Sequence, residues 1–356
     1  MSGRTVLITG AAGFIGSCLA QTLLKTVEGI RIVGVDNMND YYDVSLKEYR
    51  LKETKKLARE KEEGSERPFL FIRGDIGEQE LVRELFERYR PEIVVNLAAQ
   101  AGVRYSITNP DAYIESNLVG FYNILEGCRH SYDYGQAGVR HLLYASSSSV
   151  YGSNRKVPYS VEDKVDHPVS LYAATKKSNE LLAHAYGKLY GIPSTGLRFF
   201  TVYGPAGRPD MAYFGFTDKL VRNEKIRIFN YGNCRRDFTY IDDIVTGVME
   251  IMCRQPGENP DGVRYKIYNI GNNHPENLMD FVDVLSKELK GAGVLPEEYD
   301  LEAHMELVEM QPGDVETTYA DTTELERDFG FKPETGLREG LRQFAQWYKD
   351  FYGQKA

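Results

Sequence analysis

The sequence predicts an α/β protein whose main domain is a doubly wound parallel sheet, followed by a smaller α/β domain. Three observations support this prediction. Short apolar runs alternate with longer helical patterns over the first two-thirds of the chain, a glycine-rich turn follows the first run, and the pattern changes to short mixed segments after Pro205. This alternation is typical of strands joined by crossover helices into a parallel sheet, whose strands are covered on both faces and almost wholly apolar.

Six apolar runs are predicted to be strands and four longer segments are predicted to be helices. The strands are Thr5–Thr9, Ile30–Asp36, Phe69–Gly74, Ile93–Ala98, His141–Ser146 and Ser194–Phe200. The helices lie near residues 14–26, 78–89, 112–130 and 171–190. Residues 45–67, between the second and third strands, are crowded with Lys, Glu and Arg. That composition predicts a solvated helix and loop.

The composition excludes several classes of protein. Among 356 residues, 42% are hydrophobic and 27% are charged, which argues against a disordered or fibrous chain. A formal net charge of −9 gives no general attraction to nucleic acid or to an anionic membrane. The 4 cysteines and 6 histidines lack metal-ligand spacing, so we expect no metal. No signal peptide or membrane span is recognisable, and we expect a cytoplasmic protein.

The first predicted strand runs into Gly10-Ala-Ala-Gly13-Phe-Ile-Gly16 and then into a helix, the order that dinucleotide binding requires. Gly10 permits the tight turn, Gly13 lets the backbone approach a pyrophosphate, and Gly16 lets the helix pack closely on the strand. The helix N-terminus offers N–H groups to phosphate. Phe14 and Ile15 lie in the same loop, and we expect them to contact the cofactor as well.

A carboxylate at the end of the second strand indicates which dinucleotide binds. Asp36 is placed to accept hydrogen bonds from an adenosine ribose, and it would repel a 2′-phosphate, so NAD is favoured over NADP. The ends of the third and fourth strands should line the same cleft, although core packing is an open alternative for these residues. The expected contacts there are Asp75, Ile76, Leu97, Ala98 and Ala99. Residues 1–204 are therefore predicted to form a Rossmann-type NAD-binding domain, completed by parts of 236–272.

The segment Tyr172-Ala-Ala-Thr-Lys176 opens the fourth predicted helix and places its tyrosine and lysine one turn apart on one face. A free tyrosine has a pKa near ~10, but an adjacent ammonium and an oxidised nicotinamide both favour the phenolate. Such a phenolate takes a proton from a hydroxyl as hydride leaves the same carbon. We therefore expect Tyr172 to be the base and both residues to contact the cofactor, although the spacing alone is common by chance.

A run of serines, Ser146-Ser-Ser-Ser149, ends the fifth predicted strand at the sheet edge where ligands of such folds bind. We expect Ser147 to hydrogen-bond the reacting oxygen and to shuttle a proton between substrate and Tyr172. Ser148 and Ser149 are expected to contact the substrate. A polar loop without a catalytic role is the alternative interpretation.

In this order, the glycine loop, the strand-end aspartate, the serine run and Tyr-x-x-x-Lys resemble the extended short-chain dehydrogenase/reductases. The segments Leu197-Arg-Phe-Phe-Thr201-Val-Tyr-Gly-Pro205 and Arg236-Asp-Phe-Thr-Tyr-Ile-Asp-Asp243 are similar to ones shared by nucleotide-sugar epimerases, dehydratases and decarboxylases. The resemblance runs from residue 4 to about 350.

What the resemblance implies can be assigned residue by residue. Ser147, Tyr172 and Lys176 would form the catalytic triad, and Arg236 would contact a uridine diphosphate. Residues 205–356 would mainly form the UDP-sugar-binding domain. The helices near 112–130 and 171–190 would form a four-helix interface of a homodimer.

The run Gly204-Pro-Ala-Gly-Arg208-Pro-Asp-Met211 is similar to the UDP-glucuronate 4-epimerases, in which the matching arginine and a threonine hold the sugar carboxylate. These positions are Arg208 and Thr201 here, and an arginine fork binds a carboxylate bidentately. Oxidation at carbon 4 makes a β-keto acid, and a fixed carboxylate suppresses its decarboxylation. The resemblance therefore implies NAD-dependent interconversion of UDP-glucuronate and UDP-galacturonate through a 4-keto intermediate.

Two positions depart from the relatives. Ala206 stands where those epimerases usually carry tryptophan. Gln311, in Gln311-Pro-Gly-Asp314, stands where galactose epimerases carry an arginine to the diphosphate, so Arg236 would bear more of that work. We expect Asp314 to contact the substrate.

Several alternatives remain open on the sequence. Dehydratases and decarboxylases of this group resemble one another in carrying acidic residues just after the catalytic hydroxyl, whereas positions 148 and 149 are serine here, which favours an epimerase. A 4-epimerase of UDP-glucose or UDP-N-acetylglucosamine is the nearest rival, and a UDP-glucuronate decarboxylase follows it. A non-catalytic NAD-sensing module is disfavoured because it would need no reactive tyrosine.

Overall fold

The computed structural model describes residues 1–62, 67–133, 137–310 and 315–353, and it divides into two compact units. Unit 1 comprises Met1–Asn154, Lys164–Phe199 and Val245–Tyr268, and unit 2 comprises Arg155–Asp163, Phe200–Ile244 and Asn269–Ala356. The domain division expected from the sequence, 1–204 and 205–356, stays a prediction. No helix in the described part of the chain is long and apolar enough to cross a membrane.

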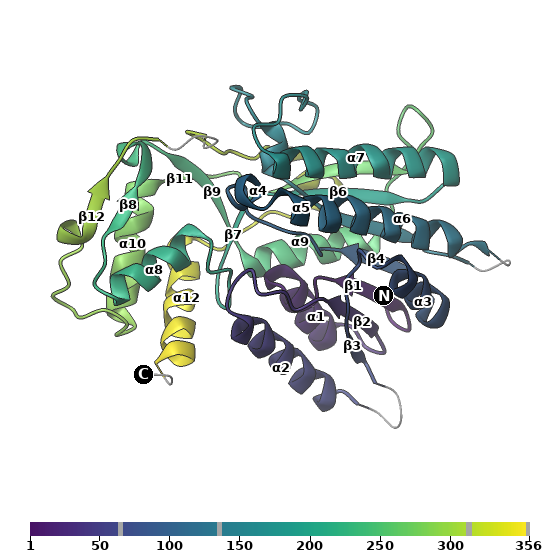
Figure 1. Cartoon of the computed structure of the whole chain (residues 1–356), viewed down its shortest axis with the longest axis horizontal. Coiled ribbons are helices and arrows are strands. Elements are labelled where there is room, and N and C mark those ends of the chain that lie inside the picture. The colour runs from purple at the N-terminus through teal and green to yellow at the C-terminus, as the bar shows by residue number, and fades with distance from the viewer. Residues whose placement is uncertain (63–66, 134–136, 311–314, 354–356) are drawn as a thin grey trace. The chain divides into compact units, whose positions relative to one another are not determined.

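Unit 1 is built on a seven-stranded sheet in the order β10-β6-β5-β4-β1-β2-β3 (Figure 1). All neighbouring pairs from β3 to β6 are parallel, and all six expected strands are present, so the predicted Rossmann-type doubly wound fold is confirmed. The strands are β1 Thr5–Thr9, β2 Arg31–Asp36, β3 Phe69–Arg73, β4 Ile93–Asn96, β5 His141–Ser147, β6 Ser194–Phe199 and β10 Tyr265–Ile270.

The strand order reverses between β1 and β4, which fixes where a ligand should bind. Val6 of β1 pairs with Ile32 of β2 on one side and with Ile93 of β4 on the other. Ligands of open α/β sheets bind at the carboxyl ends of the strands beside such a reversal. The glycine loop follows β1 and residues 97–99 follow β4, so both lie at this edge.

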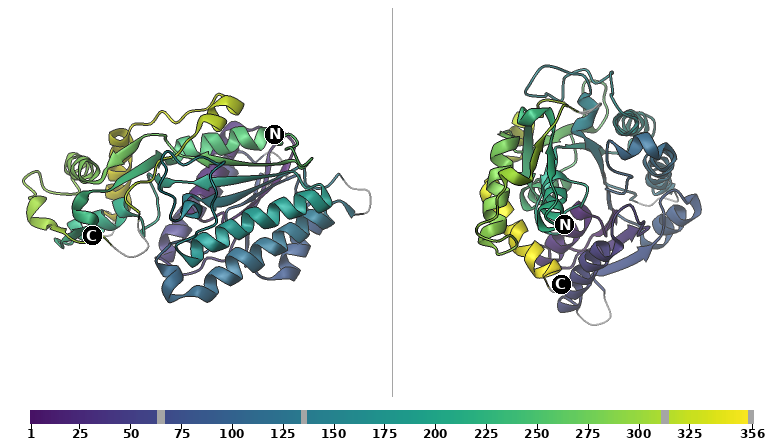
Figure 2. Two further views of the ribbon diagram at one scale, coloured as in Figure 1. Left: turned by 90° about the horizontal axis from the view of Figure 1, so that it is seen from above. Right: turned by 60° about the vertical axis from the view of Figure 1, so that its left-hand side comes forward.

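Helices cover both faces of this sheet, with α6 and α7 along one side and α1 on the other (Figure 2, left). The unit contains α1 Phe14–Thr26, α2 Val44–Glu60, α3 Gln79–Tyr89, α4 Tyr105–Thr108, α5 Pro110–Tyr113, α6 Gly120–His130, α7 Leu171–Tyr190 and most of α9 Ile241–Cys253. The helix expected near 112–130 is interrupted by a π-helical segment, η1 Ile114–Val119. Ser170 caps α7 by accepting a 3.1 Å hydrogen bond from the Ala173 N–H.

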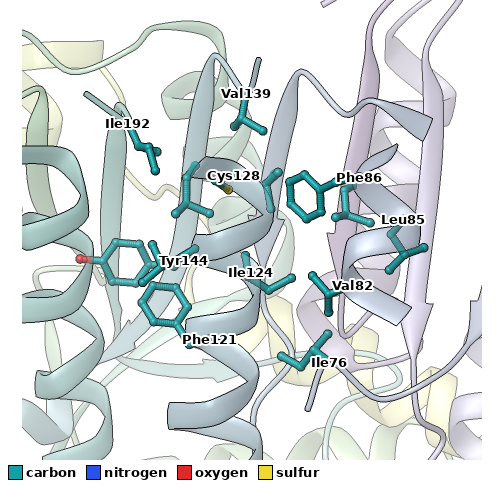
Figure 3. Close-up of a cluster of buried hydrophobic side chains, with 14 of the residues drawn as sticks. Ile76, Val82, Leu85, Phe86, Phe121, Ile124, Cys128, Val139, Tyr144 and Ile192 are labelled. Atoms are coloured by element: carbon teal, nitrogen blue, oxygen red, sulfur yellow. The ribbon is translucent and has the colours of Figure 1, made fainter. Parts of the chain in front are cut away.

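A buried apolar cluster fixes α3, α6 and α7 onto the sheet (Figure 3). The ring of Phe121 on α6 lies 5.2 Å, centroid to centroid, from the ring of Tyr144 on β5. Cys128 is fully buried in this cluster, and burial raises the pKa of its thiol. Cys128 therefore packs as a small apolar residue.

Unit 2 contains a three-stranded sheet, β11-β9-β7, and a two-stranded sheet, β12-β8. The strands are β7 Thr201–Tyr203, β8 Ile226–Ile228, β9 Arg235–Tyr240, β11 Pro275–Asn277 and β12 Met305–Leu307. The helices are α8 Ala212–Val221, α10 Leu278–Gly291, α11 Thr323–Phe329 and α12 Leu337–Tyr352. Phe344 of α12 packs edge-on against Tyr213 of α8, with ring centroids 4.8 Å apart, so aromatic side chains hold these helices together.

Candidate active site

The glycine loop after β1 forms a cradle that side chains would fill. Gly10 has φ of +70°, and a β-carbon there would lie 2.8 Å from the main-chain nitrogen of Ala98. Gly13 donates its N–H to the Gly10 carbonyl at 2.9 Å, and a β-carbon at Gly16 would collide with the same carbonyl. Gly13 has no side chain with which to cap α1, and the first N–H groups of a helix lack intrahelical acceptors. These residues therefore fit the pyrophosphate of a dinucleotide.

Asp36, at the end of β2, is held beside this loop. Its carboxylate accepts N–H hydrogen bonds from Ala12 at 3.1 Å and from Met38 at 2.9 Å. The ammonium of Lys47 lies 3.8 Å from Oδ1 of Asp36. Burial lowers the pKa of Lys47, and the charge of Asp36 opposes that shift. The carboxylate is therefore oriented by the backbone in the position expected for a ribose acceptor.

The residues after β3 are engaged within the protein. Oδ1 of Asp75 accepts the Gly77 N–H and Oδ2 accepts a side-chain N–H of Asn37, each at 2.8 Å. The side chain of Ile76 is 4% exposed and belongs to the apolar cluster under α3 and α6. Core packing therefore accounts for the position of Ile76 in this structure, and its contact with a cofactor stays a prediction.

Residues 97–99 lie directly against the glycine loop. The Leu97 N–H donates to the Thr9 carbonyl at 3.3 Å, and the Ala98 N–H donates to Oγ1 of Thr9 at 3.1 Å. A β-carbon at Gly10 would press on both Leu97 and Ala98. The structure thus brings Leu97 and Ala98 to the cradle, and Ala99 follows them as a half-buried residue.

The catalytic pair expected from the sequence lies at the start of α7. Tyr172 is half-buried, whereas Lys176 is 3% exposed, and the Lys176 ammonium lies 6.0 Å from the centroid of the Tyr172 ring. Lys176 donates a 3.1 Å hydrogen bond to the carbonyl of Ala145 in β5. The Tyr172 ring packs edge-on against Tyr113, with centroids 6.0 Å apart. These contacts fix the lysine one turn below the phenol.

The serines at the end of β5 and the start of the following turn make different contacts. Ser146 points inward and donates a 2.7 Å hydrogen bond to the carboxylate of Glu180 on α7. Oγ of Ser147 accepts the N–H of Ser149 at 3.2 Å and donates to its hydroxyl at 3.1 Å, which caps the short 3₁₀ turn η3, Ser148–Tyr151. Ser148 and Ser149 are half-buried. Because α7 packs against both β5 and η3, the serines and Tyr172 belong to one packed assembly.

Sequence reasoning missed Asn117, which lies in the π-helical segment and is 2% exposed. Its side chain accepts the Gln100 N–H at 2.8 Å and donates to the Gln100 carbonyl and to Oγ1 of Thr175, each at 3.1 Å. Asn179 donates to the Asn117 carbonyl at 2.7 Å. Asn117 therefore joins the loop after β4 to the helix that carries Lys176. A polar residue within a helical pattern gives no such signal in the sequence.

A second missed feature is a buried ion pair behind the serine run. Glu180 of α7 and Arg198 of β6 are each 1% exposed and make two parallel hydrogen bonds, of 2.8 and 2.9 Å. Arg198 also donates to the hydroxyl of Tyr151 at 3.0 Å. Burial alone would raise the pKa of Glu180, but the hydrogen bonds and charge of Arg198 outweigh it and hold that pKa below its usual value. The pair ties α7 to β6 and η3.

Within unit 2, two expected substrate residues lie on neighbouring strands. Thr201 of β7 pairs with Phe238 of β9, the strand that also carries Arg236. The Arg236 guanidinium donates to the carbonyls of Arg235 and Glu316, both at 3.0 Å. Arg236 is thus held along its own strand by two main-chain carbonyls.

A buried carboxylate next to Arg236 was also missed. Asp237 is fully buried and accepts main-chain N–H bonds from Asn272 at 2.6 Å, Asn273 at 3.1 Å and Ala320 at 3.0 Å. Burial raises the pKa of Asp237, and these N–H groups oppose the shift. The carboxylate therefore fastens two chain segments, at residues 272–273 and at Ala320, to the start of β9.

Arg208 already has a carboxylate partner within its own loop. Its guanidinium donates two hydrogen bonds to Asp210, at 2.9 and 2.6 Å. Ala206, in the preceding turn, lies in the left-handed region with φ of +53°. Asp314 and Gln311 lie outside the described residues. Among the described residues, no group of three or more His, Cys, Asp and Glu side chains could hold a metal ion.

The doubly wound fold, the glycine cradle at the strand-order reversal and the Tyr172–Lys176 pair on α7 together place the chain in the extended short-chain dehydrogenase/reductase class. The model of the family described as GDP-mannose 4,6 dehydratase matches residues 7–344, and the chain belongs to this family. The resemblance inferred from the sequence is therefore confirmed.

Relatives of known name cover nearly the whole chain. Protein CapI of Staphylococcus aureus is 49% identical over 98% of this chain and 99% of its own length. UDP-glucuronate 4-epimerase 4 of Arabidopsis thaliana is 44% identical over 99% of this chain and 76% of its own length. Among solved structures, UDP-glucuronic acid 4-epimerase from Bacillus cereus, in complex with UDP-glucuronic acid and NAD, gives a TM-score of 0.82 at 31% identity, covering 98% of this chain and 100% of that one.

Proposed function

We propose that this chain is an NAD-dependent 4-epimerase that interconverts UDP-glucuronate and UDP-galacturonate. The single observation that carries the proposal is the solved relative with both UDP-glucuronic acid and NAD bound, which aligns with 98% of this chain. The glycine cradle and the backbone-held carboxylate of Asp36 support NAD as the cofactor. The Tyr172–Lys176 pair supports oxidation of a hydroxyl group rather than binding alone.

When bound, NAD supplies the hydride acceptor and donor for carbon 4 of the sugar. Tyr172 takes the proton of the carbon 4 hydroxyl and returns it after the 4-keto sugar has presented its opposite face. Lys176, fixed to the Ala145 carbonyl, keeps an ammonium one turn from that phenol. Ser147 hydrogen-bonds the reacting oxygen, and its own bonds to Ser149 hold its hydroxyl in place. The proton thus moves between the substrate oxygen and the phenol of Tyr172.

Arg208 and Thr201 are proposed to hold the uronate carboxylate, as the resemblance to the UDP-glucuronate 4-epimerases implies. In this structure, the guanidinium of Arg208 already binds the carboxylate of Asp210 through two hydrogen bonds. The substrate therefore has to share or replace Asp210 as the partner of Arg208. Arg236, Ser148, Ser149 and Asp314 are further proposed substrate contacts, with Arg236 on the diphosphate. The contacts of Phe14, Ile15, Asp75, Ile76 and residues 97–99 with NAD also stand as proposals.

Purified protein incubated with UDP-glucuronate and no added nucleotide is expected to form UDP-galacturonate, because the same cofactor is regenerated in each turnover.

Arg208→Ala should lower kcat/KM for UDP-glucuronate by roughly ten- to a hundredfold, because that factor corresponds to the free energy that charge-assisted hydrogen bonds contribute to binding. Arg222→Ala, which removes an exposed arginine of the same unit, is the matched control. Conversion confined to uncharged UDP-sugars and insensitive to Arg208→Ala would assign the chain to the rival epimerases instead.

A homodimer built on η1, α6 and α7 is the proposed assembly. Large apolar side chains are exposed there: Leu181 is 61%, Leu189 69%, Val119 44% and Tyr122 42% accessible. Neighbouring exposed apolar side chains of this kind mark protein interfaces. Leu181→Asp should halve the molar mass measured by light scattering at micromolar concentration, whereas Leu307→Asp in unit 2 should leave it unchanged. An unchanged mass for Leu181→Asp would count against this interface.

A cytoplasmic location is proposed from cysteine usage. Cys18, Cys128, Cys234 and Cys253 are all free thiols, which is the usual state in a reducing compartment. Mass spectrometry of alkylated protein taken directly from cells should find all four thiols reduced.

A further inference from the structure

Lys47 of α2 lies beside the carboxylate of Asp36, the proposed ribose acceptor, and Arg50 of the same helix reaches the glycine loop. Lys47 is 5% exposed and Arg50 is 1% exposed, and their spacing places them on one face of the helix. Charged side chains are almost never buried without partners. They belong to the charge-rich stretch 45–67, for which we expect a solvated helix and loop, and they are the buried charged residues among its described positions.

The contacts of these cations converge on the edge of the glycine loop. Lys47 donates to Oδ1 of Asn39 at 2.7 Å, and its ammonium lies 3.8 Å from Asp36 and 5.3 Å from the centroid of the Tyr42 ring. Arg50 donates to the Tyr42 hydroxyl at 2.7 Å and to the carbonyl of Ala12 at 3.3 Å.

Lys47 thus acts on Asp36 directly, whereas Arg50 contacts the glycine loop through Ala12. The Ala12 peptide donates its N–H to Asp36, and its carbonyl accepts from Arg50. Asp40 is the other carboxylate that acts on Lys47, and it is exposed. At close range, the buried carboxylate of Asp36 thus faces the buried ammonium of Lys47.

We propose that Lys47, supported by Arg50, is a specificity-determining residue for the dinucleotide: it forms a latent site for a 2′-phosphate that the Asp36 carboxylate masks. This inference rests on the proposed binding of NAD beside Asp36. In the wild-type chain, the carboxylate of Asp36 accepts hydrogen bonds from the adenosine ribose and repels a 2′-phosphate. Removing that one carboxylate leaves the buried ammonium of Lys47 beside the vacated position, and an ammonium is a group that binds phosphate. Arg50 supports this site by holding the Ala12 peptide of the adjoining glycine loop.

The consequence is a change of cofactor by a single substitution that adds no basic residue. Asp36→Ser should raise the ratio of bound NADP to bound NAD by at least about tenfold over wild type. The reason is that Lys47, without the Asp36 carboxylate beside it, would bind the 2′-phosphate instead. When Asp36→Ser is combined with Lys47→Met, the ratio of bound NADP to bound NAD should be about tenfold lower than in Asp36→Ser alone. Relief of repulsion alone would act equally in both variants, so their difference isolates the contribution of Lys47.

The test measures bound nucleotides rather than turnover. Each protein is incubated with equimolar NAD and NADP until the ratio of bound nucleotides is constant, freed of unbound nucleotide, and denatured for quantification. Asp36→Ser combined with Lys52→Met removes an exposed lysine from the same helix and should match Asp36→Ser alone. Lys47→Met alone should keep NAD and exclude NADP more strongly than wild type, which also shows that this position tolerates the change.

Equal ratios in Asp36→Ser and its Lys47→Met combination would overturn the inference, as would an equal loss in the Lys52→Met combination. Binding of NAD by the wild type is read in the same experiment. A wild type that binds neither nucleotide would refute the proposed function and this inference together, whereas a wild type that binds NAD with no effect of Lys47→Met would refute the inference alone.

Discussion

Replacing Tyr172 by phenylalanine is expected to lower the rate of UDP-glucuronate epimerisation by about 10²–10⁴-fold while NAD stays bound. The substitution removes only the phenolic oxygen, which is the proposed acceptor of the carbon 4 hydroxyl proton. The ring remains able to pack against Tyr113 as it does now, with centroids 6.0 Å apart, so the start of α7 should keep its shape. Lys176 keeps its bond to the Ala145 carbonyl.

Initial rates follow from chromatographic separation of the two UDP-uronates, and bound NAD is measured after denaturation. Tyr190→Phe, at the opposite end of the same helix, removes the same hydroxyl far from the proposed chemistry and should leave the rate unchanged. A Tyr172→Phe enzyme that turns over within tenfold of the wild-type rate would show that another group takes the proton.

Breaking the buried ion pair between Glu180 and Arg198 should cost about 3–5 kcal/mol of unfolding free energy, because the remaining charge would be buried without its partner. Glu180→Gln keeps the shape of the side chain and removes only its charge. Urea denaturation measures the loss. Asp283→Asn, which breaks an exposed pair with Lys287, is the control and should cost less than about 1 kcal/mol.

Replacing both members of the pair, Glu180→Met with Arg198→Met, should recover much of the loss, since no lone charge is left in the interior. A double variant as unstable as either single one would mean that the hydrogen bonds to Ser146 and Tyr151, rather than the charges, hold this region.

The pH dependence of this stabilisation has a definite sign. The pKa of Glu180 in the folded chain lies below the ordinary value of 4.5, so the folded state favours the ionised carboxylate. The stabilisation is therefore fully present above pH 4.5 and is lost as the pH falls through the lower, folded-state pKa. The difference in urea midpoint between wild type and Glu180→Gln should shrink accordingly on acidification.

Local patterns explain how much of the fold was predictable. Apolar runs marked the six strands to within two residues at each end, because strands buried on both faces admit few polar side chains. The glycine loop was recognisable because a turn against Ala98 leaves no room for a β-carbon at Gly10. In unit 2, the strands β7, β8, β11 and β12 have three residues each, which is too few to show a period.

The missed residues share a different property. Asn117, Arg198 and Asp237 act through partners 17 to 83 positions away in the chain, and no spacing rule links such pairs. Lys47 was missed because a charge-rich helix is normally solvated, and only packing against the glycine loop turns one of its faces inward. Buried polar contacts that hold a site together are thus visible only once the tertiary structure is known.

The central claim is that carbon 4 is oxidised and then reduced at its opposite face within one active site. UDP-glucuronate carrying deuterium on carbon 4, converted in ordinary water without added nucleotide, tests it directly. The account predicts that the UDP-galacturonate formed keeps its deuterium on carbon 4, because the same hydride returns to the sugar. Replacement of that deuterium by hydrogen from the solvent, or the absence of any UDP-galacturonate, would contradict it.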